Sequence, residues 1–244
     1  MGWYAVFRRE MKLLWKKVGK MGYVFSFLVS PFIYLFAFGL GLGGRVNVDG
    51  GYLPFLAAGI IGVTVMLNAY QQTASSISSG KYFRHFQNII VSPIPVGQVI
   101  FGIILAGVVR SLLFGALVFL VALLAFSVIG LNSMPAVAGV ILGALCFSSL
   151  GVVVGMLVNN PDDISIVNNF FITPMTFFGG SFFPLHNLPV WLAAIMKLTP
   201  IASLNTMLRA ASWQGDVWWA AGVMTGLTCI FYGWGVWLYT RYSE

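Results

Sequence analysis

Long apolar stretches constrain this chain more than any other feature of its sequence. A helix that crosses a bilayer needs about 20 mostly apolar residues, and such stretches occur at residues 22–43, 52–76, 96–128, 136–158, 164–180 and 217–239. With 59% hydrophobic and only 8% charged residues among 244, the chain has too few charges to cover a soluble globule. We therefore expect an all-α, polytopic membrane protein with six transmembrane helices and one domain over residues 1–244.

The first 20 residues form a basic, amphipathic segment. On a helical wheel, one face of residues 3–20 is apolar and the opposite face is basic. This pattern is typical of an interfacial helix that lies among lipid headgroups, but a basic face of this kind also suits an acidic soluble partner. The apolar face carries Trp3, Phe7, Met11, Leu14 and Val18, and the basic face carries Arg8, Arg9, Lys12, Lys16 and Lys20.

The basic residues outside the apolar stretches predict the topology. Cytoplasmic loops of membrane proteins are enriched in Lys and Arg, so the N- and C-termini are expected in the cytoplasm. This topology places nine basic residues inside and three outside. The inner set is Arg8, Arg9, Lys12, Lys16, Lys17, Lys20, Lys81, Arg84 and Arg241, and the outer set is Arg45, Lys197 and Arg209.

The residue types needed for bond chemistry or metal binding do not cluster in the sequence. Cys146 and Cys229 lie in separate apolar stretches, and His85 and His186 have no other ligand type at metal-site spacing. There is no Walker A motif and no readable catalytic triad. We therefore predict no catalytic, cofactor-binding or metal residues and no enzyme activity. The basic residues follow the membrane edge, so nucleic acid is not an expected partner.

Residues 80–91 form a second amphipathic segment on the cytoplasmic side. A short helix of this kind can dock into a groove of a soluble partner, or it can rest on the membrane surface; the sequence leaves both interpretations open. One side carries Tyr82, Phe83, Phe86, Ile89 and Ile90, and the other carries Lys81, Arg84, His85 and Asn88.

Several polar residues fall inside the apolar stretches, where they are costly. Together they could line a substrate path, while singly they are better explained as contacts that hold helices together. For Arg110, a functional role would be attraction of an anionic group, and the favoured structural role is hydrogen bonding to a neighbouring helix. The candidate path residues are Asn68, Gln71, Gln72, Arg110, Asn168, Asn169 and Thr173.

Two motif groups carry a resemblance to a known family. Val91-Ser92-Pro93-Ile94-Pro95 follows the amphipathic segment at 80–91. Further on come Phe177-Phe178-Gly179-Gly180-Ser181-Phe182-Phe183-Pro184, then Asn187-Leu188-Pro189-Val190-Trp191-Leu192, Leu198-Thr199-Pro200 and Leu208-Arg209. The whole chain resembles ABC-2 type transporter permeases, including the drug-resistance and nodulation-factor exporter permeases of bacteria.

The resemblance implies a permease subunit in a bacterial or archaeal inner membrane. It implies a homodimer or heterodimer of permeases among membrane lipids, with each subunit docked on a separate ABC ATPase that binds ATP and Mg. The substrate would be a drug, a lipid or a glycan. Residues 80–91 would form the coupling helix, and residues 181–215 an external re-entrant segment. The implied coupling residues are Lys81, Tyr82, Phe83, Arg84, His85, Phe86, Ile89 and Ile90.

Three other classes of membrane protein remain as alternatives. A transporter driven by an ion gradient would need acidic or histidine relays in its spans, and the cores of the six stretches contain no Asp, Glu or His. A lipid-modifying enzyme would need a clustered acid, base or metal site. A regulatory membrane subunit that has lost transport would keep the same spans, so the sequence does not exclude it.

Overall fold

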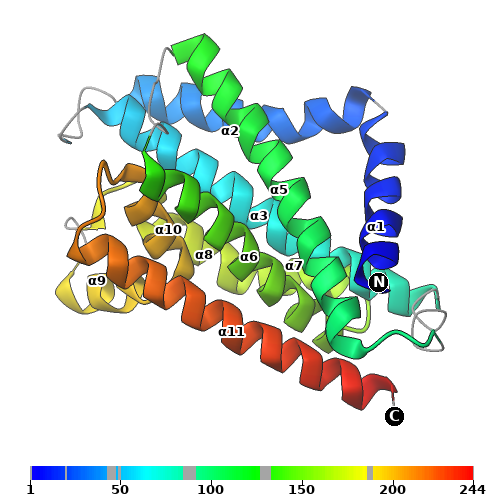
Figure 1. Ribbon diagram of the computed structural model, residues 1–244. Coiled ribbons are helices and arrows are strands. Elements are labelled where there is room, and N and C mark those ends of the chain that lie inside the picture. Colours follow the sequence, from blue (N-terminus) through cyan, green and yellow to red (C-terminus); the bar gives the residue numbers. More distant parts are fainter. Residues whose placement is uncertain are drawn as a thin grey trace.

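The computed structural model describes residues 2–19, 21–42, 48, 51–84, 92–126, 133–185 and 189–243. These residues form helices and short connections and contain no strand, which confirms the all-α class. Figure 1 shows long helices packed side by side, with the two chain ends toward the same end of the bundle. The longer helices are α1 (Gly2–Val18), α2 (Met21–Leu42), α3 (Tyr52–Tyr82), α5 (Val96–Phe126), α6 (Met134–Leu157), α9 (Val190–Lys197), α10 (Pro200–Arg209) and α11 (Gly215–Ser243).

Four of the described helices are long and apolar enough to cross a membrane, namely α3, α5, α6 and α11. A fifth crossing results if α9 and α10, which meet at an angle of 85°, count as one broken span. In α2 the apolar part among the described residues is the shorter Phe25–Gly39. The fold is thus that of a multi-pass membrane protein with four or five such helices, and the predicted count of six is not established by helix length.

The stretch at 164–180 is broken, although the sequence predicts one span there. It divides into α7 (Ile164–Val167), a π-helical turn η2 (Asn168–Ile172), α8 (Thr173–Thr176) and a second π-helical turn η3 (Phe177–Ser181). Pro174 has no N–H to donate, and the N–H of Thr173 bonds to the oxygen of Asn168, five residues back. At the far end Gly180 has φ 78°, a left-handed conformation that glycine adopts readily.

Helix α3 is the central helix, and it is longer than predicted. The polar residues 71–79 continue the helix to Tyr82 and do not end it. At 1.5 Å per residue, its 31 residues span about 46 Å, which exceeds the roughly 30 Å of a hydrocarbon core. The last turns of α3 therefore either project beyond the hydrocarbon or require the helix to tilt.

Small residues bring α3 and α6 into backbone contact. A Cβ on Gly151 would lie 2.6 Å from the oxygen of Tyr70, and a Cβ on Gly155 would lie 2.8 Å from the oxygen of Ala74. Glycine at such positions allows helix backbones to approach closely, as is common in membranes. Helices α5, α10 and α2 pack around the same central helix.

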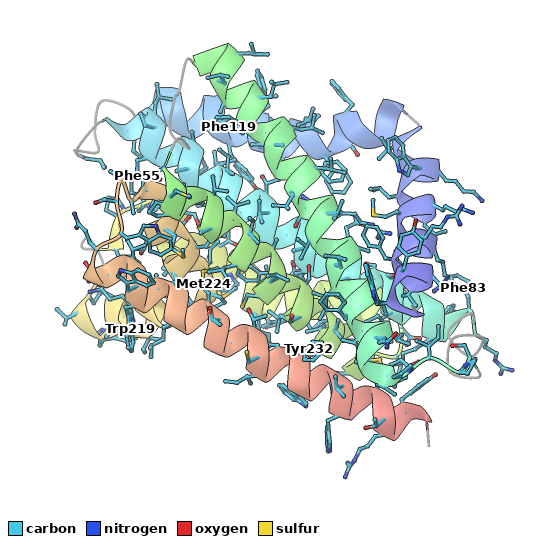
Figure 2. The ribbon with its side chains drawn as sticks, in the orientation of Figure 1. Phe55, Phe83, Phe119, Trp219, Met224 and Tyr232 are labelled. Atoms are coloured by element: carbon cyan, nitrogen blue, oxygen red, sulfur yellow. The ribbon has the colours of Figure 1, made fainter. Side chains whose placement is uncertain are left out.

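Helix α11 covers one side of the bundle and is largely exposed (Figure 1). Its aromatic side chains Trp218, Trp219, Trp234 and Trp237 face outward. Figure 2 shows Trp219 near one end of the molecule and Phe83 near the opposite end. The hydroxyl of Tyr232 donates to the oxygen of Gly97 at 3.2 Å, which ties α11 to the start of α5.

Candidate functional site

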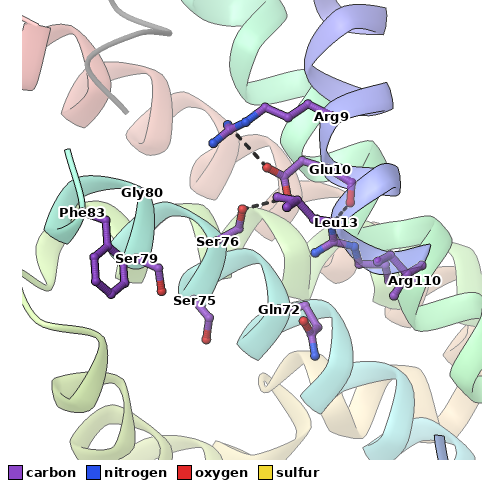
Figure 3. A pocket seen from close by; sticks show the side chains of 11 residues that line it. Arg9, Glu10, Leu13, Gln72, Ser75, Ser76, Ser79, Gly80, Phe83 and Arg110 are labelled. Carbon is purple, nitrogen blue, oxygen red and sulfur yellow. Dashed lines mark hydrogen bonds and ion pairs between the residues drawn. The ribbon is translucent and has the colours of Figure 1, made fainter. Parts of the chain in front are cut away.

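A buried charged cluster joins α1, α3 and α5. Oε2 of Glu10 lies 3.0 Å from Nη2 of Arg110 and accepts a 2.8 Å hydrogen bond from the hydroxyl of Ser76 (Figure 3). The same Nη2 also donates to the main-chain oxygen of Glu10. Glu10 is 2% exposed and Arg110 is 5% exposed. Because a lone buried charge is costly, each residue makes the burial of the other tolerable.

This cluster corrects the predicted orientation of the N-terminal helix. The side of α1 that packs on the bundle is centred on Val6, Glu10 and Leu14, all buried, whereas Phe7 and Met11 are only half-buried. Residues 6, 10 and 14 recur every four positions and so share one face. The sequence analysis did not single out Glu10. The signal that could have found it is an acidic residue whose neighbours at positions i−4 and i+4, here Val6 and Leu14, are both apolar. Placement of α1 in the lipid headgroups stays a prediction.

A cavity of about 240 Å³ lies beside the charged cluster. One face of α3 provides four polar residues of its lining, α1 provides Arg9 and Glu10, and α5 provides Arg110 (Figure 3). The α3 residues recur every three or four positions, as one helical face requires. They are Gln72, Ser75, Ser76 and Ser79.

Two of the seven predicted path residues, Gln72 and Arg110, line this cavity. Asn68 is buried, and its amide donates to the oxygen of Thr64 in the preceding turn of α3 at 2.9 Å. Gln71 is half-buried. The favoured structural role of Arg110 agrees with its contacts, which include a carbonyl as predicted and a carboxylate that was not predicted.

The other three path residues lie on the broken helix. Asn168 is half-buried, whereas Asn169 and Thr173 are exposed and share a face with the exposed Ile166 and Phe170. None of the three lines the cavity beside Arg110. Within one chain, the structure therefore does not bring the predicted path residues together.

The predicted coupling segment begins inside α3. Gly80, Lys81 and Tyr82 belong to the last turn of that helix, and Arg84 follows with φ 57°. Lys81 was expected on the polar side of the segment; instead it is buried, and its Nζ donates to the oxygens of Met156 and Val158 at 2.6 and 3.0 Å. These carbonyls end α6 and need a donor, which explains the difference.

The aromatic residues that follow Lys81 are exposed. Phe83 is 62% exposed, and its ring packs edge-on against that of Tyr82 with centroids 5.2 Å apart. His85, Phe86, Ile89 and Ile90 lie outside the described residues. Their predicted coupling role stays a prediction.

At the other end of the molecule, α10 holds the break at η3. The amide of Asn205 donates to the oxygen of Gly179 at 3.0 Å, and Nη1 of Arg209 donates to the oxygen of Gly180 at 2.8 Å. The guanidinium of Arg209 also donates to the oxygen of Phe55 at 3.1 Å and lies 3.5 Å from the centroid of its ring. The sequence analysis counted Arg209 among the basic residues on the outer side, within the external re-entrant segment, and did not predict that α10 is buried along most of its length.

Comparison with known proteins identifies the family. The sequence profile of the family described as ABC-2 type transporter matches residues 1–213. The chain belongs to the ABC-2 type transporter family. This confirms the resemblance seen in the sequence and makes the chain a membrane transport permease.

Two relatives illustrate what this ABC-2 permease is similar to. The inner membrane transport permease YadH of Escherichia coli K12 is 34% identical over 185 residues, which cover 75% of this chain and 72% of the relative. Nodulation protein J of Rhizobium leguminosarum bv. viciae is 31% identical over 212 residues, which cover 86% and 81% of the two chains. Both alignments extend over most of the permease.

Proposed function

We propose that this permease is the membrane subunit of an ATP-binding-cassette exporter and couples to a separate ATPase subunit. The observation that carries the proposal is the end of α3, where the buried Lys81 is followed directly by the exposed rings of Tyr82 and Phe83. Exposed aromatic side chains next to an anchored helix end suit docking into a groove of a soluble partner. The absence of a Walker A motif in the sequence fits an ATPase on another chain.

The contacts of Lys81 support a route from the ATPase into the membrane part. A push on residues 83–91 would act on the end of α3, and the hydrogen bonds of Lys81 to Met156 and Val158 would carry it into α6. A partner that closes on ATP can drive rigid-body tilting of this kind. ATP and Mg would stay on the ATPase, and this subunit would bind no cofactor.

We further propose that the permease pairs with a second permease subunit through the face of α7 to η3. Asn169 and Thr173 are exposed there among Ile166, Phe170 and Phe177. Polar side chains in a membrane normally face protein or water and not lipid. With this broken helix and α2 counted as spans, the subunit has six, its termini lie in the cytoplasm, and the substrate path follows the interface.

The substrate class that we propose is a drug, a lipid or a glycan. YadH is named as a transport permease, and the relative from Rhizobium leguminosarum is named as a nodulation protein. The predicted path residues are neutral amides and hydroxyls apart from Arg110, which is neutralised by Glu10. A path of this kind offers hydrogen bonds without a fixed charge, which suits a bulky, neutral or amphiphilic molecule.

The deciding experiment measures ATP hydrolysis of the reconstituted complex. The permease is placed in lipid with a candidate ABC ATPase subunit from the same organism, and the wild type is compared with the Phe83→Ala, Arg84→Ala, Phe86→Ala triple variant. We expect the triple variant to lose complex formation or transport-stimulated hydrolysis. Trp234→Ala, which removes an exposed ring from α11, is the matched control and should keep both. If no ATPase binds the wild type, the proposal is wrong.

A cross-linking experiment tests the dimer face. The chain has an exposed natural cysteine, Cys229 on α11, and a buried one, Cys146. In a Cys229→Ser background, Asn169→Cys should form a disulfide-linked dimer under mild oxidation, whereas wild-type Cys229 should not. Dimers through Cys229 and none through position 169 would place the interface on α11 instead.

A further inference from the structure

The cavity between α1, α3 and α5 contains more hydrogen-bond donors than the packing of these helices uses. The hydroxyls of Ser75 and Ser79 line it, and neither has a hydrogen bond to another part of the described chain. Nε of Arg110 also lacks a partner in the described chain, but it is too deeply buried to face the cavity. Acceptor oxygens of a ligand could bond to the two serine hydroxyls without breaking a contact between the helices.

The charge of the cavity favours an anion. Two guanidinium groups, those of Arg9 and Arg110, face a single carboxylate. That carboxylate, of Glu10, is already held at 3.0 Å by Arg110 and at 2.8 Å by Ser76, while Arg9 lies 3.7 Å away and is 41% exposed. The lining therefore has a net charge of about +1 at neutral pH, and Arg9 is the cation with most freedom to take a new partner.

The donor set fits a phosphate group. Guanidinium groups and hydroxyls on three helices offer several N–H and O–H donors, and a phosphate offers several acceptor oxygens in the matching tetrahedral arrangement. Leu13, Leu14 and Phe83 add an apolar part to the same lining. The exposed basic side chains Arg8 and Lys12 on the adjacent face of α1 would attract anionic headgroups from the membrane surface.

We propose that this cavity binds a phosphate group, supplied by the headgroup of an anionic phospholipid. Its oxygens would bond to Arg9, Ser75 and Ser79, and the apolar residues would contact the glycerol and upper acyl chains. The bound headgroup would join α1 to α3 at the end of the bundle that holds both chain termini (Figure 1). Phe83 also belongs to the proposed ATPase contact, and Gln72 and Arg110 to the predicted path, but the proposed headgroup is neither the transported substrate nor a part of the ATPase.

Neighbouring arginines on α1 allow a matched test. Short-chain phosphatidylglycerol is titrated onto the full-length permease in a neutral detergent, and bound lipid is counted by native mass spectrometry. Arg9→Gln removes a charge that lines the cavity, whereas Arg8→Gln removes one from the exposed surface. We expect Arg9→Gln to weaken binding by about tenfold or more, since charge-assisted hydrogen bonds are lost. Arg8→Gln should change it by no more than about twofold.

A second variant fills the cavity without touching a charge. Ser79→Leu should abolish binding of phosphatidylglycerol while the thermal unfolding of the lipid-free permease stays close to that of the wild type. Inorganic phosphate and neutral diacylglycerol serve as separate probes. Protection against thermal unfolding by phosphatidylglycerol alone identifies a lipid headgroup, and equal protection by inorganic phosphate identifies a soluble phosphate compound as the source.

One result of the arginine comparison would overturn the proposed phosphate site. Equal losses of affinity in Arg9→Gln and Arg8→Gln would show attraction to the general basic surface and no built site. Should Ser79→Leu misfold, the pair of arginine variants still decides. None of these measurements involves an ATPase, so failure here leaves the proposed transport function standing, and failure of ATPase coupling leaves this site standing.

Discussion

Lys81 at the end of α3 caps the end of α6 through Met156, whose main-chain oxygen lies 2.6 Å from its ammonium nitrogen. A second hydrogen bond, to the oxygen of Val158 at 3.0 Å, completes the cap. The last carbonyls of a helix have no partner within the helix, and a cation near them also interacts favourably with the helix dipole. The contact makes the two helix ends one unit.

We predict that Lys81→Met destabilises the permease by about 1–3 kcal/mol, because the carbonyls of α6 lose charged hydrogen bonds. Chemical unfolding in detergent measures this change. Arg84→Ala, which removes an exposed charge three residues on, should leave unfolding unchanged. Equal stability of Lys81→Met and the wild type would show that water replaces the ammonium group without cost.

The pair of Glu10 and Arg110 predicts strongly coupled substitutions. Glu10→Ala leaves the guanidinium of Arg110 buried without its carboxylate, a change that costs about 3–5 kcal/mol when one partner of a buried pair is removed. Glu10→Leu together with Arg110→Met removes both charges and should recover most of that stability. A double-mutant cycle of unfolding free energies checks this, and additive effects would contradict the prediction.

The close approach of α3 and α6 predicts that Gly151 is sensitive to the smallest enlargement. A Cβ there would lie 2.6 Å from the oxygen of Tyr70, so Gly151→Ala should cost about 1–3 kcal/mol through overpacking. Gly226 in α11 is the matched control, since a Cβ there would meet no atom within 4 Å. Gly226→Ala should therefore leave the melting temperature unchanged or raise it slightly.

The hydrogen bond from Arg209 to Gly180 in η3 predicts that Arg209→Lys is not a conservative change. Lysine keeps the charge but cannot donate to Gly180 and Phe55 together while lying flat over the ring of Phe55. We expect a loss of about 1–2 kcal/mol in stability, given the cation–π and hydrogen-bond contributions. Limited proteolysis near residues 179–185 should be faster in Arg209→Lys than in Lys197→Arg, an exposed control.

The sequence predicted the helical class, the four continuous apolar helices and the family, because apolar stretches and the motifs near residues 177–209 are local signals. It did not predict the extension of α3 to Tyr82, because the serines and the glycine at residues 75–80 have weaker helix propensity than the residues before them. The break in the stretch at 164–180 was foreshadowed by Pro174, but the two π-helical turns depend on packing that a sequence does not display.

The candidate site was predicted less well than the fold. Gln72 and Arg110 were correctly singled out as polar residues in apolar surroundings, but their partner Glu10 lies 100 positions before Arg110. Lys81 was predicted on the polar side of residues 80–91, facing solvent, whereas it is buried against the end of α6. A helical wheel treats a lysine as solvated and contains no information about the carbonyls of a distant helix. Pairings of this kind depend on tertiary contacts between distant segments.

The backbone contact of α3 with α6 at Gly151 and Gly155 has a mechanical consequence. No layer of rotatable side chains separates the two helices at these points, so they cannot slide past each other by changing rotamers. We therefore expect α3 and α6 to move as one rigid unit, with the end of α3 bonded to the end of α6 through Lys81. Conformational change during a transport cycle is then expected to be concentrated at the irregular parts of the helices, in the π-helical turns around Pro174 and at the 85° bend between α9 and α10.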